Sequence, residues 1–95
     1  MPSPSWFVPR GNALKWRRWN ESFVVFNPAS GDTHYLNAIA GSVLKLLETE
    51  PASVEQIVTH LEAISGEPLD GELREQINGL VERFDAVGLI EPVKT

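Results

Sequence analysis

Residues 23–37, with the sequence FVVFNPASGDTHYLN, restrict the possible folds of this chain more than any other stretch. Residues 23–26 form an aromatic and β-branched run that ends at an Asn-Pro pair, which is the pattern of a strand and its terminator. Residues 30–32 (SGD) supply a turn, because Gly reaches positive φ at no steric cost and Asp can bond the backbone ahead of it. A second short strand follows at residues 33–36, and Asn37 is placed to cap a helix. The stretch predicts a β-hairpin that leads into a helix.

A further strand is expected ahead of the hairpin, at LKWRRW. The two-residue period of a strand places Leu14, Trp16 and Arg18 on one face and the other three residues on the opposite face. Three strands with a helix behind them are viable where two alone would be marginal. The sequence therefore predicts antiparallel strands at residues 14–19, 22–26 and 33–36.

The first residues have a different composition. Residues 1–12 contain three of the seven prolines and are expected to be a loose lead-in. Within them, Trp6-Phe7-Val8 is too apolar to be left in water, so it should tuck against the sheet. The alternative is that it forms part of a surface for a partner.

Three helices are expected after the sheet. The first begins at Asn37 and ends near residue 48. Ser53 starts a capping box with Gln56 and so begins the second helix. Asp70 is the N-cap of the third helix, and Gly88 stands where a left-handed C-cap is required. Apolar residues recur at spacings of three and four along all three segments.

These elements predict an α+β fold in one domain of 95 residues. A three-stranded antiparallel sheet (14–36) is followed by a three-helix unit (37–93) that resembles a winged helix-turn-helix, with residues 89–93 as a candidate wing strand. Two glycines interrupt the helices, where each costs about 1 kcal/mol relative to Ala. Gly41 is expected to let another backbone come close. Gly79 either softens a groove wall or has no role.

The residues that catalysis and metal binding require are scarce. The chain has no Cys, and its two histidines, His34 and His60, are not followed or preceded by carboxylates at ligand spacing. We therefore predict no enzyme, no catalytic residue, no metal and no cofactor. No apolar run reaches the roughly 18 residues that cross a bilayer, and no secretory signal is recognisable, so a cytoplasmic protein without a membrane partner is expected.

The net charge of −5 is unevenly distributed. Residues 1–36 carry four basic and two acidic side chains, whereas residues 37–95 carry four basic and eleven acidic ones. Phosphate neutralisation is the main source of affinity for DNA, so an acidic helical half argues against nucleic acid as a partner. A winged-helix nucleic-acid-binding domain remains the alternative, with the basic KWRRW stripe as a surface for single-stranded bases.

The third possibility is peptide recognition by strand addition. A sheet with a free edge beside an amphipathic helix offers unpaired backbone groups along one wall of a groove. Backbone hydrogen bonds alone cannot offset the cost of association, so the third helix should supply apolar pockets. Ile77, Val81 and Phe84 are the residues available for them.

Most of the chain also resembles a known family. The basic, Trp-containing first strand, VVFN, SGD, THYLN, VLKLL, the Ser-capped second helix and the final GLIEP together resemble the PqqD-like peptide chaperones, also called RiPP recognition elements. The likeness covers about residues 6–93. SGDTH followed by a Leu-Asn pair looks closest to the branch associated with an HPr-kinase-related protein.

The resemblance implies a non-enzymatic chaperone or adaptor. Such proteins bind the leader of a ribosomally made precursor peptide as an added strand and present it to a modifying enzyme, for which the resemblance suggests an HPr-kinase-related protein. Carried over by position, the peptide-binding residues are Thr33, His34, Tyr35, Leu36, Arg74, Ile77, Asn78 and Val81. The basic first part of the chain predicts an acidic leader and binding that weakens in salt. A structural partner domain, or a homodimer through the free sheet edge, is left open.

Overall fold

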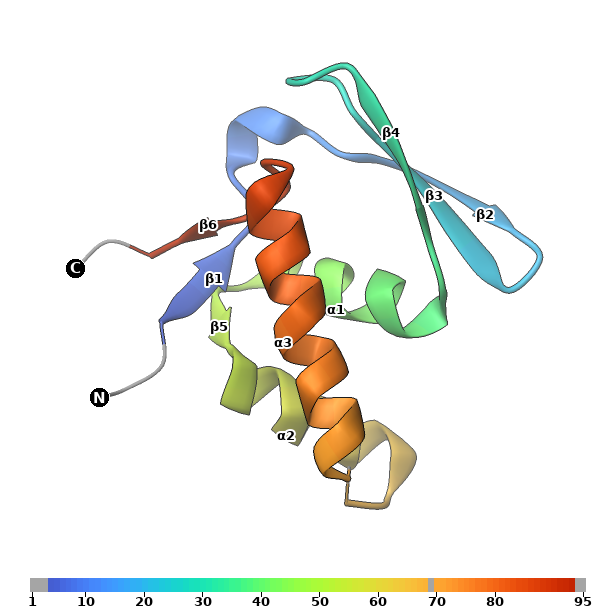
Figure 1. The fold of residues 1–95 in the computed structure, drawn as a ribbon. Coiled ribbons are helices and arrows are strands. Elements are labelled where there is room, and N and C mark those ends of the chain that lie inside the picture. Colours follow the sequence, from blue (N-terminus) through green and yellow to red (C-terminus); the bar gives the residue numbers. More distant parts are fainter. Residues whose placement is uncertain (1–3, 69, 94–95) are drawn as a thin grey trace.

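The computed structural model describes residues 4–68 and 70–93 and shows two small sheets and three helices (Figure 1). The elements in chain order are β1 (Ser5–Phe7), a 3-10 turn (Arg10–Asn12), β2 (Lys15–Trp19), β3 (Ser22–Asn27), β4 (Asp32–Leu36), α1 (Ala38–Thr49), β5 (Ala52–Ser53), α2 (Val54–Ser65), α3 (Gly71–Ala86) and β6 (Glu91–Pro92). The predicted α+β class, with a three-stranded antiparallel sheet ahead of three helices, is confirmed.

The larger sheet has the order β2-β3-β4, with both pairs antiparallel. Its two turns use residues with positive φ, Asn20 at 56° and Gly31 at 79°. Val25 of β3 pairs with Trp16 of β2 and His34 of β4, and this row lies on the inner face. Because β3 is central, β4 has one hydrogen-bonded neighbour and forms an edge of the sheet.

α1 packs across the inner face of this sheet. Val25 and Leu36 are buried there together with the inner residues of α1. Gly41 lies directly under the ring of Phe23, and a Cβ at this position would overlap the ring. The close approach expected at Gly41 therefore exists, but its partner is a side chain and not a backbone.

The predicted helix caps are present. The Asn37 side chain accepts a hydrogen bond from the Ala40 amide at 2.8 Å, and Ser53 forms a complete capping box with Gln56. The Asp70 carboxylate accepts from the Leu73 amide at 2.8 Å. Gly88, with φ of 80°, follows the end of α3. These polar side chains satisfy amides that an isolated helix start leaves without partners.

The second sheet includes part of the segment that was expected to be a loose lead-in. β1 lies between β5 and β6 and pairs antiparallel with both. The expectation of a loose segment over residues 1–12 is thus wrong for residues 5–7 and 10–12, while residues 1–3 lie outside the described part of the chain. Within the apolar Trp6-Phe7-Val8 segment, Trp6 and Phe7 belong to a separate sheet with β5 and β6 and do not join β2-β3-β4. The candidate wing strand at residues 89–93 contains β6, and β6 pairs with β1.

The core is built from residues of both sheets and of all three helices. Val43, Leu44, Ile77, Phe84 and Leu89 are among its fully buried side chains. The Asn12 side chain is also buried, and its amide donates to the Gly88 carbonyl at 3.1 Å, which joins the start of the chain to the end of α3. Among the described helices, none is long and apolar enough to pass through a bilayer.

Candidate functional site

The two edges of the larger sheet differ in their side chains. Three of the five residues of β2 are Lys or Arg, which is a common protection of an edge against unwanted pairing. β4 reads DTHYL and carries no Lys or Arg. Along β4, Thr33 and Tyr35 are exposed, whereas Leu36 is buried and His34 is half-buried. β4 is therefore the edge with less protection, and its inner side chains point toward the helices.

A cavity of about 330 Å³ lies between β4 and the C-terminal half of α3. β4 and the start of α1 form one wall, and α3 with the chain after it forms the other. Its lining residues are Thr33, His34, Tyr35, Leu36, Asn37, Ala40, Leu80, Arg83, Phe84, Val87 and Leu89.

A second cavity of about 310 Å³ adjoins the first and shares Asn37, Leu80 and Arg83 with it. Its other lining residues are Ile39, Gln76 and Gly79. We call the two together the β4–α3 cleft. The cleft has an unpaired strand edge on one side and apolar side chains of α3 on the other.

Two polar groups in the cleft lack partners within the described chain. Nε2 of His34 is buried and forms no hydrogen bond. A buried polar group without a partner typically costs about 1–3 kcal/mol. The Arg83 guanidinium is exposed and forms no ion pair or hydrogen bond with the described residues. It is the cation that lines both cavities.

The residues expected on α3 occupy different surroundings. Ile77 and Val81 are 0% and 2% exposed and belong to the core behind the cleft. Arg74 faces α2, where Nη1 lies 3.4 Å from Oε1 of Glu55. Asn78 is exposed. None of these four residues lines either cavity of the cleft, so their part in binding stays a prediction.

Other residues of α3 face β4 instead. Leu80, Arg83 and Val87 line the cleft together with Phe84, which was expected to supply a pocket. Leu80 and Val87 belong to the apolar repeat of α3, but spacing alone does not say which members of a wide stripe face the core. Arg83 had no signal beyond its position three residues after Leu80.

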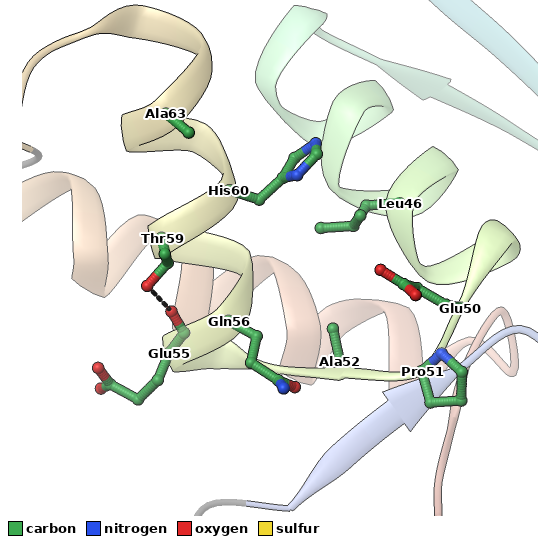
Figure 2. A pocket seen from close by; sticks show the side chains of 9 residues that line it. All are labelled: Leu46, Glu50, Pro51, Ala52, Glu55, Gln56, Thr59, His60 and Ala63. Carbon is green, nitrogen blue, oxygen red and sulfur yellow. Dashed lines mark hydrogen bonds between the residues drawn. The ribbon is translucent and has the colours of Figure 1, made fainter.

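Another cavity, of about 530 Å³, lies in a surface groove between α1 and α2 (Figure 2). Two of its polar side chains already form hydrogen bonds at the start of α2 or within it. Gln56 completes the capping box, and the Thr59 hydroxyl donates to the Glu55 carbonyl at 3.0 Å. His60 is exposed at the rim. Over the described residues, no three His, Asp or Glu side chains gather where they could hold a metal ion.

Comparisons with known proteins agree with the sequence resemblance. The sequence model of the family described as Coenzyme PQQ synthesis protein D (PqqD) matches residues 22–90, a range that includes β4 and α3. A solved structure described as TbiB1 in complex with the TbiA(beta) leader peptide is similar in fold, with a TM-score of 0.69 and 14% sequence identity. The similarity covers 94% of this chain and 99% of that one. A search of curated proteins gave no match.

Proposed function

This chain belongs to the PqqD family, and we propose that it binds the leader of a ribosomally made precursor peptide as an extra strand on β4. The observation that carries the proposal is the unpaired edge of β4 beside an apolar cleft. An incoming strand would use the free backbone groups of β4 and place alternate side chains in the cleft. The similar fold of a chain solved with a leader peptide supports this assignment.

The energetics require both walls of the cleft. Four backbone hydrogen bonds contribute about 0.5–1.5 kcal/mol each, whereas association costs about 4–15 kcal/mol. Two or three apolar side chains, at about 1.5–3 kcal/mol each when fully buried, must therefore contribute at least as much as the backbone hydrogen bonds. Leu80 and Phe84 of α3, and Val87 directly after its end, are the residues that would receive them.

The peptide-binding residues that we propose are Thr33, His34, Tyr35 and Leu36 on the strand side. On the helix side, Ile77 and Val81 support the wall from the core, and Leu80 and Arg83 contact the guest. An acidic side chain of the leader would pair with Arg83. Arg74 and Asn78 would meet the peptide only if it extended beyond the cleft toward α2.

The role that follows is that of a non-enzymatic adaptor in the cytoplasm. It would hold the leader and present the rest of the precursor to a modifying enzyme, for which an HPr-kinase-related protein is our candidate. No feature of the cleft favours nucleic acid as the partner. A homodimer through the β4 edge would use the same backbone groups, so it would compete with the peptide.

The experiment starts from short random peptides displayed on phage and selected against the protein. A selected peptide is then added at saturation, and backbone amide exchange is followed by NMR. We expect slower exchange within residues 33–36 and no change in β2, the matched second edge of the same sheet. Failure to enrich any peptide, or protection confined to other elements, would contradict the proposal.

Light scattering of the same samples tests the homodimer. If the protein alone is a dimer that the peptide converts to a complex with a single protein chain, both partners use one edge. If the dimer persists with the peptide bound, its interface lies elsewhere.

A further inference from the structure

Gly79 lies in the middle of α3, and the fold does not require a glycine there. Glycine in a helix interior costs about 1 kcal/mol relative to Ala. A Cβ built at Gly79 would have no atom within 4 Å, and the backbone at this residue does not have positive φ. Neither a close contact nor an unusual conformation therefore explains the residue.

At Gly41, by contrast, the packing of the protein does require a glycine. It also interrupts a helix, but the Phe23 ring occupies the space that its Cβ would need. The two mid-helix glycines thus have the same intrinsic cost and opposite surroundings. At Gly41 the packing of the protein accounts for the cost, whereas at Gly79 no contact with the described residues does.

Gly79 borders the second cavity of the β4–α3 cleft. This cavity of about 310 Å³ lies between the start of α1 and α3, and Gly79 forms part of its lining. Ile39, which is 38% exposed, and the half-buried Leu80 supply apolar surface to it. Gln76, Arg83 and Asn37 supply polar groups. Any side chain at position 79 would project from the helix wall into or over this space.

We propose that Gly79 determines the size of one side chain of the bound peptide. The absence of a Cβ leaves room for a bulky apolar side chain, which contacts Ile39, Leu80 and the bare backbone of α3. The inference rests on the proposed function, because it needs a peptide in the cleft. It identifies a residue that selects among peptides by the size of one side chain. The β4 edge and Arg83 do not distinguish peptides by size.

A single methyl group at this position should be measurable. One extra methylene in an apolar pocket changes discrimination by about tenfold or more. Gly79→Ala should therefore weaken binding of a peptide selected on the original protein by about tenfold. It should not weaken the fold, since Ala is the better helix former and the site is open.

The test repeats the phage selection with three proteins, which are the original chain, Gly79→Ala and Gly71→Ala. Gly71 is the matched control, because it is also in α3 and also has no atom within 4 Å of a built Cβ, but it lies at the helix start and outside the cleft. Peptides enriched on the original chain and on Gly71→Ala should share a bulky apolar residue at one position. Peptides enriched on Gly79→Ala should carry a smaller residue there and keep the rest of the pattern.

The outcomes separate the two proposals. If the original chain enriches peptides that protect β4, and Gly79→Ala enriches the same residues with the same affinity, the role of Gly79 is refuted while the peptide function stands. Loss of the whole pattern in Gly79→Ala would also refute it, since more than one side chain would then depend on the residue. If the original chain enriches nothing, the peptide function itself has failed. Thermal unfolding of each variant confirms that Gly79→Ala is folded.

Discussion

Phe23 has a fixed position in this protein. Its ring makes an edge-to-face contact with Trp16, with centroids 5.8 Å apart and planes at 87°. The Lys45 amine lies 4.7 Å from the centroid of the same ring. With neighbours on these sides and Gly41 below, we expect the ring to have little room to turn away from a larger residue. A cation near an aromatic ring contributes about 0.5–1 kcal/mol at an exposed site, which further holds it in place.

Gly41→Ala should accordingly destabilise the protein, although it replaces a poor helix former with the best one. Overpacking a core costs about 1–3 kcal/mol, and the gain in helix propensity is about 1 kcal/mol. We expect a net loss of about 1 kcal/mol in the free energy of unfolding, measured by urea denaturation. Ser42→Ala, at the exposed neighbouring position, should change it little. A Gly41→Ala variant as stable as Ser42→Ala would show that the ring can move.

At the scale of elements, α3 has three faces that contact different parts of the protein. Ile77, Val81 and Phe84 form the core face, Arg74 faces α2, and Leu80 with Arg83 borders β4. The ordinary helical period brings residues 80, 83, 84 and 87 to one side of the helix. A single helix thus supports the fold and lines the cleft.

Arg83 and Arg74 provide a matched pair for the electrostatic part of the proposal. Arg83→Gln should weaken binding of a selected acidic peptide by about twofold to fivefold at low salt, the effect of one exposed ion pair. It should also make the affinity less dependent on salt. Arg74→Gln removes a cation that already pairs with Glu55 and lies outside the cleft, so it should change both quantities less than Arg83→Gln does. Isothermal titration at two salt concentrations measures them, and equal effects of the two variants would contradict the assignment of Arg83.

The sequence predicted the elements with strong local signals. Turns, capping residues and alternation predicted the strands of the larger sheet and the edge position of β4. They also predicted the caps at Asn37, Ser53 and Asp70. β1, β5 and β6 were not predicted as a sheet, because two or three residues each, far apart in the chain, have no local pattern. The helix side of the cleft was also missed, since spacing identifies a stripe but not which of its edges meets β4.

At the scale of the whole molecule, β1 connects parts of the chain that are remote in sequence. Trp6 pairs with Ala52 of β5 and Pro92 of β6, and its half-buried ring packs against the core. The Val8 amide also donates to the Leu47 carbonyl of α1 at 3.3 Å. The first described residues therefore hold the last strand and the α1–α2 connection together.

Trp6→Ala should lower the free energy of unfolding by about 1–2 kcal/mol, because a half-buried aromatic side chain contributes part of the 1.5–3 kcal/mol of a fully buried one. Trp19→Ala is the control, since this side chain is 65% exposed on the larger sheet and should have a smaller effect. Denaturant unfolding measures both. If Trp19→Ala is the more destabilising change, the second sheet contributes less than its contacts indicate.

The pairing of β1 with β6 also places the two ends of the described chain in contact, where the Val93 amide donates to the Ser5 carbonyl at 2.8 Å (Figure 1). A short covalent linker between these ends, with new termini opened in the exposed turn between α2 and α3, would give a circular permutant that retains the β4–α3 cleft. In the same way, a protein fused next to β1 or β6 would leave the β4 edge accessible. The domain is thus suited to being carried as a module on another protein.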